Sequence, residues 1–261
     1  MKDILVELTG KRRADAAERE AVRPFADVMR AAESAPPPRG FASALRGGGT
    51  GIIAELKKAS PSEGLIRADF RPAALARELA DSGASALSVL CEPHRFLGGE
   101  AYLREARAEA GIPILYKDFL STRYQLAEAR AAGADAALLI AAVLDDAALR
   151  DLIAFAHSLG LDALVETHDR AEIARAVEAG AGIVGVNCRN LRDFSTDVSL
   201  LEMLVGEIPR PCVRVAESGM HTAEAIAKAR AAGADGFLVG TALMRAPSPG
   251  AKLRDLSGAQ E

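Results

Sequence analysis

Two stretches of the chain, ARAAGADAALLI at residues 129–140 and ARAAGADGFLVG at residues 229–240, begin with the same seven residues. Each joins an Ala-rich helical end to a short apolar strand through a glycine. Glycine commonly ends a helix because it adopts the left-handed conformation at little cost. The same plan occurs in looser form at residues 78–90, 109–117, 158–166 and 176–187. A repeated unit of helix, glycine and strand therefore organises most of the chain.

Apolar runs that fit strands recur along the chain, at residues 52–57, 85–90, 112–117, 136–140, 162–166, 183–187, 212–217 and 236–239. They are apolar throughout rather than alternating, which is typical of parallel strands buried on both faces. Helical patterns lie between them, for example at residues 70–82, 145–159 and 222–232. Eight such units predict an α/β protein of the (β/α)8 TIM barrel type. An open doubly wound sheet is the alternative, although it rarely contains eight regular units.

A helical extension precedes the first unit. Residues 1–33 carry a charged, amphipathic pattern that predicts one helix, and SAPPPRG at 34–40 ends it because prolines cannot continue a helix. RGGGTG at 46–51 is a second break, and its glycines precede a strand, whereas dinucleotide-binding glycines follow one. We therefore expect a linker there. The expected organisation is one barrel domain over residues 1–261, with an N-terminal extension at 1–45 and a barrel core at about 50–247.

Composition excludes several classes of function. The 261 residues are 49% hydrophobic and 26% charged with a net charge of −4, which is ordinary for a soluble globular protein. Few aromatic residues and no basic block argue against nucleic acid as a partner. Three widely spaced cysteines without a CxxC motif predict neither disulfides nor a metal site, and they fit a reducing compartment. The charged N-terminus does not resemble a signal peptide, and the longest apolar run, 136–144, is too short to cross a membrane. We expect a cytoplasmic protein.

Charged and polar residues end several of the predicted strands. In a (β/α)8 barrel the C-terminal strand ends form the active site, so these residues would converge on one rim. A single charge at a strand end is commonly just solvated, but a group of them needs partners or a ligand. The second and fourth strands supply nothing obvious apart from Cys91. The other strand ends supply Glu55, Lys57, Lys117, Glu166, Asn187, Arg189 and Glu217.

The last two strands are followed by small residues, in ESG at 217–219 and VGT at 239–241. Loops after these strands form the usual phosphate site of such barrels, and glycine lets backbone N–H groups approach an anion closely. The pair of turns predicts a phosphate site at this rim.

The lysines and histidines of the chain allow further kinds of catalysis, such as Schiff-base formation by a lysine. A strand-end lysine could form a Schiff base, but that needs an apolar surrounding, and here the lysines lie among glutamates. His94, His157 and His221 are expected on the surface, whereas His168 lies close to Glu166 in the sequence and is less certain to be a surface residue. No HExxH motif, Walker loop or catalytic-triad spacing is visible.

The segment IIAELKKASPSEGLI at residues 52–66 resembles the signature of the indole-3-glycerol-phosphate synthase family. The resemblance continues in the same order through SALSVLCEP, ILYKDF, GADAALLIAAVL, LVETHD, GVNCRNL, VAESG and FLVGTALM, and it covers the chain from about residue 40. Several positions depart from the family pattern: Tyr116 stands where Arg is common and Glu63 where Lys is common, and Cys91, Cys188 and Thr241 also differ. Tyr116 and Glu63 bear on the charge balance around the site.

The resemblance implies a reaction. The family closes the indole ring of 1-(2-carboxyphenylamino)-1-deoxyribulose 5-phosphate with loss of carbon dioxide and water, a carboxy-lyase step of tryptophan biosynthesis that needs no cofactor or metal. Phosphoribosylanthranilate isomerase, a related phosphate-binding barrel, is an alternative, but it pairs Cys with Asp where this chain has Glu55 and Lys57. A non-catalytic phosphate-binding barrel is another alternative. The expected partner is a small phosphorylated substrate. A monomer is the expected state, and docking with another enzyme of the pathway stays open.

The resemblance also implies roles for individual residues. Lys117 is expected to be the general acid at the substrate carbonyl and Glu166 the acid/base partner in dehydration. Glu55 and Lys57 act beside them, with Lys57 either holding the substrate carboxylate or serving as a second acid, and Asn187 fixes an oxygen. The expected substrate ligands are Ser60, Phe119, Leu138, Arg189, Glu217 and Ser218. The expected phosphate ligands are Gly219, Leu238, Gly240 and Thr241. The segment 58–66, with Pro61 and Gly64 around two serines, predicts a loop that closes over the ligand.

Overall fold

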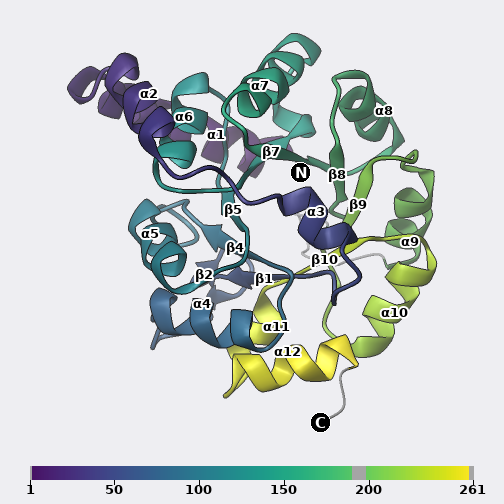
Figure 1. Ribbon diagram of the computed structural model, residues 1–261. Helices are drawn as coiled ribbons and strands as arrows, with labels where there is room; N and C mark the ends of the chain where they lie inside the picture. Colours follow the sequence, from purple (N-terminus) through teal and green to yellow (C-terminus); the bar gives the residue numbers. More distant parts are fainter. Residues whose placement is uncertain (1, 190–197, 259–261) are drawn as a thin grey trace.

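The computed structural model describes residues 2–189 and 198–258 and contains a closed barrel of parallel strands (Figure 1). Each strand pairs with the next along the chain, and the last returns to the first, where Ile53 faces Leu238. The predicted barrel is confirmed, and each predicted strand lies within a few residues of an observed one. The barrel strands are β1 (Ile52–Leu56), β4 (Ala86–Leu90), β5 (Ile114–Lys117), β6 (Ala136–Ile140), β7 (Asp162–Thr167), β8 (Ile183–Val186), β9 (Val213–Ala216) and β10 (Gly236–Val239).

Helices surround the strands, as the repeated unit predicted (Figure 1). In the two most similar repeats, Gly133 and Gly233 follow the helix ends with φ of 91° and 102°, a conformation that favours glycine over other residues. Side-chain caps begin several of these helices; Thr122 and Thr222, for example, accept a backbone N–H bond at equivalent positions. The helices of this layer are α4 (Pro72–Asp81), α5 (Glu100–Glu109), α6 (Arg123–Ala131), α7 (Asp146–Ser158), α8 (Arg170–Glu178), α9 (Val198–Glu207), α10 (Ala223–Ala231), α11 (Thr241–Arg245) and α12 (Pro249–Ser257), with the 3-10 turn η1 (Ala141–Val143) after β6.

The N-terminal extension differs from the prediction of one helix over residues 1–33. It forms two helices, α1 (Lys2–Val22) and α2 (Phe25–Ser34), and that prediction was wrong at Pro24. Pro24 has φ −56° and ψ 150°, which is not helical, and proline lacks the N–H that would continue α1. The proline bend therefore lets the extension change direction.

A short helix that the sequence did not predict, α3 (Phe41–Arg46), covers the N-terminal end of the barrel (Figure 1). Its Phe41 and Leu45 are buried in one apolar cluster with strand residues such as Ile53 and Val213. The backbone N–H of Ala42 donates to the carboxylate of Asp162, the first residue of β7, at 2.9 Å. The N-terminal end of the barrel is therefore sealed by side chains, and the opposite end is left for the cleft.

The segment 58–66 was predicted as a loop. It contains a two-stranded antiparallel hairpin, with β2 (Ala59–Ser60) paired to β3 (Gly64–Leu65) around a turn at Pro61. Its closure over a ligand stays a prediction.

The structure also describes the cysteines and the apolar character of the helices. Cys91, Cys188 and Cys212 are all buried thiols, so they pack as small apolar side chains. Across residues 2–189 and 198–258, none of the helices combines the length and the apolar character needed to span a bilayer.

Candidate active site

A cleft opens at the C-terminal ends of the barrel strands. It holds about 920 Å³ of space, part of which is open to solvent, and a smaller pocket of about 280 Å³ adjoins it. Every residue that the sequence assigned to the site lines one of these two spaces. The larger is lined by Ser60, Lys117, Phe119, Leu138, Glu166 and Asn187, the smaller by Gly219, Gly240 and Thr241, and both by Glu55, Lys57, Arg189, Glu217, Ser218 and Leu238.

Lys117 lies at the centre of the cleft. Leu115, two residues earlier on β5, is buried in the cluster inside the barrel, so strand alternation directs Lys117 into the barrel mouth as well. Its Nζ lies 2.9 Å from Glu217, 3.7 Å from Glu166 and 3.9 Å from Glu55. Burial alone would lower the pKa of this ammonium, but the three carboxylates outweigh burial and raise the pKa above its ordinary value. Lys117 is therefore a charged ammonium and not a neutral amine ready for Schiff-base formation.

Glu166, the penultimate residue of β7, lies beside two polar neighbours. The Asn187 side chain donates a hydrogen bond of 3.2 Å to Oε1 of Glu166, and His168 Nε2 lies 3.2 Å from the same oxygen. Burial would raise the pKa of Glu166, but the contact with His168 and the charge of Lys117 outweigh it and lower the pKa to about 2. Glu166 is therefore ionised over the physiological pH range.

The pKa of Glu217 is raised, in contrast to that of Glu166. Burial raises its pKa to about 7; the charge of Lys117 opposes this rise, and the neighbouring Glu166 carboxylate adds to it. Two carboxylates that share one ammonium do not ionise equally well, since like charges repel in a desolvated site. The pKa of Glu55 is lowered as well, because the charges of Lys57 and Lys117 outweigh burial. Near neutral pH the cleft therefore holds two ionised carboxylates, Glu55 and Glu166, and one that exchanges a proton readily.

Lys57 and Glu55 form an ion pair of 2.8 Å at the end of β1. Gly240 leaves room for this pair, because a Cβ there would lie 2.1 Å from Oε2 of Glu55 and would displace the carboxylate. Gly185 plays the same part for Glu217, whose Oε1 would lie 2.0 Å from an added Cβ. Sequence analysis assigned Gly240 only to phosphate and did not assign Gly185, because the requirement depends on a side chain from a neighbouring strand.

The smaller pocket has the features of an anion site. Gly219, with φ of 80°, and Gly240 line it with backbone, while Lys57 and Arg189 supply positive charge. The Thr241 hydroxyl is buried, and no partner for it occurs among the residues that the structure describes. A buried hydroxyl without a partner is costly, so a ligand oxygen would relieve that cost.

The apolar wall of the larger cleft is wider than predicted. Besides Phe119 and Leu138, it includes Phe96, whose ring centre lies 6.2 Å from that of Phe119. Helix α1 contributes Ile4, Leu5 and Leu8. Sequence analysis missed these residues, since the apolar positions of the N-terminal helix do not reveal which part of the barrel they cover.

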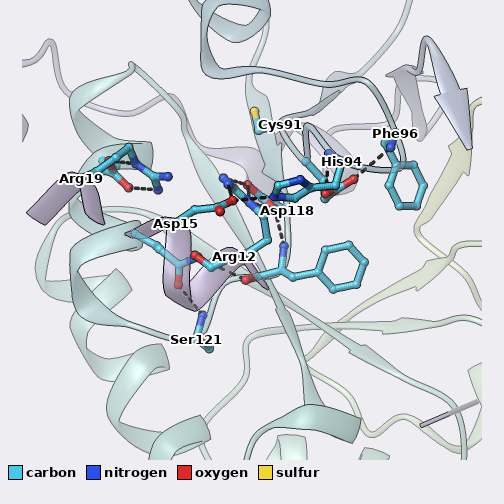
Figure 2. Close-up of polar contacts among 12 residues, drawn as sticks. Arg12, Asp15, Arg19, Cys91, His94, Phe96, Asp118 and Ser121 are labelled. Atoms are coloured by element: carbon cyan, nitrogen blue, oxygen red, sulfur yellow. Dashed lines mark hydrogen bonds and ion pairs between the residues drawn. The ribbon is translucent and has the colours of Figure 1, made fainter. Parts of the chain in front are cut away.

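A buried polar cluster fixes α1 beside the cleft, and Figure 2 shows Arg12 between Asp15 and Asp118. The Arg12 guanidinium donates to both oxygens of Asp118, the residue that follows Lys117, at 2.7–3.0 Å. His94 Nε2 lies 2.8 Å from Asp15 on α1. These contacts connect the N-terminal extension to the loops after β4 and β5.

The end of β4, where sequence analysis found nothing besides Cys91, carries Glu92. This residue is fully buried, and its carboxylate accepts backbone N–H groups from His94, Arg95 and Phe96 at 2.7–2.9 Å. The expectation of an uninformative strand end was therefore wrong: Glu92 fixes the loop that brings Phe96 to the cleft. The signal available in the sequence was the position of Glu92, an acidic residue directly after Cys91 at the strand end.

The histidines divide as the sequence suggested. His94, His157 and His221 are exposed, which confirms that prediction. His168 is buried, and its ring lies between the carboxylates of Glu166 and Glu172. Residues 2–189 and 198–258 contain no group of His, Cys, Asp and Glu side chains that could hold a metal ion.

Two departures from the family pattern are accommodated away from the catalytic groups. Tyr116 is buried in the layer between barrel and helices, on the opposite face of β5 from Lys117. Glu63, on the hairpin, forms an ion pair with Arg245 at the end of α11. Neither side chain adds an unpaired charge to the cleft.

Comparison with known proteins agrees with this geometry. A profile of the indole-3-glycerol phosphate synthase family matches residues 5–256. The chain belongs to this family. An indole-3-glycerol phosphate synthase from Albidiferax ferrireducens is 45% identical over 260 residues, covering 98% of each chain, and one from Aromatoleum aromaticum is 45% identical over 262 residues, covering 99% of this chain and 100% of that protein.

Solved structures with lower identity share the fold of this indole-3-glycerol phosphate synthase family member. A thiamine phosphate pyrophosphorylase from Pyrococcus furiosus aligns with a TM-score of 0.60 and 16% identity, over 84% of this chain and 96% of that chain. A mutant tryptophan synthase alpha-subunit from the same organism aligns with a TM-score of 0.58 and 17% identity, over 80% of this chain and 98% of that chain. At these identities the likeness concerns the barrel alone.

Proposed function

We propose that this cleft closes the indole ring of 1-(2-carboxyphenylamino)-1-deoxyribulose 5-phosphate, releasing carbon dioxide and water to form indole-3-glycerol phosphate. The observation that carries the assignment is the buried Lys117 ammonium, held by Glu217 and near Glu166 and Glu55, beside a glycine-lined anion pocket. This arrangement offers an acid, an ionised carboxylate and a phosphate site at one barrel rim.

Lys117 acts as the general acid. Ring closure places negative charge on the substrate carbonyl oxygen, and an ammonium in a desolvated cleft stabilises that charge and donates a proton to it. Glu217 orients Lys117 through their 2.9 Å contact, so its role is to hold the acid in position as well as to line the substrate site. The raised pKa of Glu217 lets it take up a proton near neutral pH when the charge of Lys117 changes.

Glu166 takes a proton in the dehydration step. It is ionised, and Asn187 holds its Oε1 while its Oε2 lies on the side of Lys117. The Ser218 hydroxyl donates to Oδ1 of Asn187, which orients the amide so that its NH2 group faces Glu166. Loss of carbon dioxide and water requires proton transfers, and Lys117 and Glu166 supply an acid and a base for them.

The phosphate, the carboxylate and the aromatic ring of the substrate fit different parts of the cleft. The phosphate binds at Gly219, Gly240 and Thr241, while the aromatic ring packs against Phe119 and Leu138. The cations between them serve the substrate carboxylate: Lys57, and Arg189, which also donates a 3.3 Å hydrogen bond to Ser62 on the hairpin. Ser60 contacts the substrate from the same hairpin.

A turnover assay tests this assignment. The purified chain should convert the substrate to a product with indole fluorescence. Glu166→Gln, which keeps the size of the side chain but cannot take the proton, should lower kcat by about 10²–10⁴-fold. His157→Gln, at an exposed position on α7, is the matched control and should behave like the wild type. Absence of turnover by the wild-type chain, or near-native kcat in folded Glu166→Gln, would refute the assignment.

The phosphate site is tested by Thr241→Val. Valine keeps the shape of threonine but removes the buried hydroxyl, and a hydrogen bond to a charged group contributes about 1.5–3 kcal/mol. KM should therefore rise by about tenfold or more, with kcat nearly unchanged, because phosphate binding contributes equally to ground state and transition state. Steady-state kinetics measures both parameters.

Thr9→Val is the matched control for this experiment. Thr9 also has a buried hydroxyl for which the described residues offer no partner, but it lines neither pocket. Its KM should stay at the wild-type value. An equal change of KM in both variants would assign the effect to packing and not to phosphate.

A further inference from the structure

His168 lies between two carboxylates, one from the barrel and one from a helix. Its Nε2 is 3.2 Å from Oε1 of Glu166 near the end of β7, an ion-pair distance without hydrogen-bond geometry, and its Nδ1 forms a 3.0 Å hydrogen bond with Oε2 of Glu172 on α8. The His168 side chain is only 5% exposed, and those of Glu166 and Glu172 are 6% and 14% exposed. A ring with a carboxylate at each nitrogen and little access to water has the surroundings of a doubly protonated imidazolium.

The start of α8 explains how the chain builds this arrangement. Asp169 caps the helix by accepting the backbone N–H of Glu172 at 2.8 Å. Glu172 reaches back and accepts the backbone N–H of His168 at 2.9 Å. This is a capping box shifted by one residue, and it holds the Glu172 carboxylate directly beside the imidazole.

The two carboxylate oxygens of Glu166 have different neighbours. Oε1 is held by Asn187 and lies beside His168. Oε2 lies 3.7 Å from Nζ of Lys117, inside the cleft. The side chain is thus anchored through one oxygen, and the other is directed to the place where the substrate binds.

The charge of His168 is consistent with this arrangement. Burial alone would lower the pKa of the imidazole, but Glu166 on β7 and Glu172 on α8 outweigh burial and raise the pKa to about 10. Asn187, the third neighbour of Glu166, is uncharged. His168 therefore carries a positive charge at neutral pH.

We propose that His168, held by Glu172, is a positioning residue that fixes Glu166 in its ionised form with one oxygen directed at the substrate. The inference rests on the proposed role of Glu166. His168 does not line the cleft, so it acts through Glu166 and does not touch the substrate. The capping box accounts for the backbone contact of Glu172, but it does not require a buried imidazole next to the proton-accepting carboxylate.

Substitution of His168 by Asn and by Gln separates its two nitrogens. Asparagine places an amide near the position of Nδ1 and so keeps the contact with Glu172, whereas glutamine reaches the position of Nε2 and keeps a donor toward Glu166. His168→Asn should lower kcat at neutral pH by about tenfold to a hundredfold, and His168→Gln should lose less. KM should stay within about twofold in both variants, since neither phosphate nor ring contacts change.

The pH profile distinguishes positioning from a purely structural role. Glu166 faces Lys117 and Glu217 in the cleft besides His168 and Asn187, and Glu217 titrates at higher pH than Glu166. Loss of the imidazolium raises the pKa of Glu166, so the acidic inflection of kcat that lies below that of Glu217 should move upward by about one to two pH units. Glu172→Gln keeps the capping bonds but removes one of the two charges that stabilise the imidazolium. Its alkaline limb should therefore move to lower pH.

The His168 experiments need a histidine control outside the cleft. His157→Asn, at an exposed position on α7, should match the wild type, and thermal denaturation verifies that each variant is folded. Equal losses of kcat in His168→Asn and His168→Gln without movement of the acidic limb, or wild-type kinetics in both, would overturn the inference. An unmoved alkaline limb in Glu172→Gln would overturn the part assigned to Glu172. Inactive Glu166→Gln beside wild-type-like His168→Asn would refute this inference alone, whereas active Glu166→Gln would refute the proposed role of Glu166 as well.

Discussion

Lys117→Ala is expected to lower kcat by about 10²–10⁴-fold while the protein stays folded. The substitution removes the only ammonium within 4.0 Å of both Glu217 and Glu166 among the described residues. Three buried carboxylates would then lack this cation, but their pKa values would rise and they would take up protons, so the fold need not carry three unpaired charges. Fluorescence of the indole product measures turnover, and thermal denaturation verifies folding.

Lys11→Ala is the matched control for this experiment. Lys11 lies on α1 with its side chain 46% exposed, and among the residues that the structure describes it pairs with the exposed Glu7 alone. It should retain wild-type kcat, because an exposed ion pair contributes little. Near-native kcat in folded Lys117→Ala would exclude Lys117 as the general acid.

Arg12→Met is expected to have the largest effect on stability. Arg12 and Asp118 form a buried ion pair in which both carboxylate oxygens accept hydrogen bonds (Figure 2). Removing one member of such a pair leaves an unpaired charge and costs about 3–5 kcal/mol of unfolding free energy. In chains near this size each kcal/mol corresponds to about 2–4 °C in Tm. Chemical and thermal denaturation measure the loss.

Two comparisons sharpen the Arg12 experiment. Asp118→Asn combined with Arg12→Met should recover most of the loss, because the asparagine oxygen still accepts the Phe119 N–H and no charge is left unpaired. The cost of Arg12→Met alone should shrink as pH falls, since burial already raises the pKa of Asp118 and the unpaired carboxyl takes a proton more readily. An unchanged Tm, or a cost that grows at low pH, would contradict the assignment.

Much of the barrel could be predicted from local patterns. The glycine after each helix marks a turn that few other residues adopt, and apolar strands between such turns have few alternatives to a parallel sheet. Strand alternation placed Lys117 on the inner face of β5, and the structure agrees. Pro24 was also visible in the sequence, so the break between α1 and α2 was a missed local signal.

The geometry of the cleft required contacts between distant parts of the chain. Glu217 was expected to bind substrate, but it is also the closest partner of Lys117, a hundred residues earlier. Phe96 and the apolar residues of α1 reach the cleft only because Glu92 folds one loop and Arg12 attaches one helix. Contacts between residues so far apart in the sequence do not produce a periodic pattern from which they could be predicted.

The amino-acid sequence by itself determined the barrel, its orientation and the set of residues at its C-terminal rim, because backbone conformation and strand alternation are local properties. The family membership followed from the same residues, and the comparisons agree with it. Only the tertiary structure decided which carboxyl group has a raised pKa, which oxygen of Glu166 faces Lys117 and what a side chain at Gly185 or Gly240 would displace. Those properties depend on burial and on distances of a few ångströms between strands, which exist only after the barrel has closed.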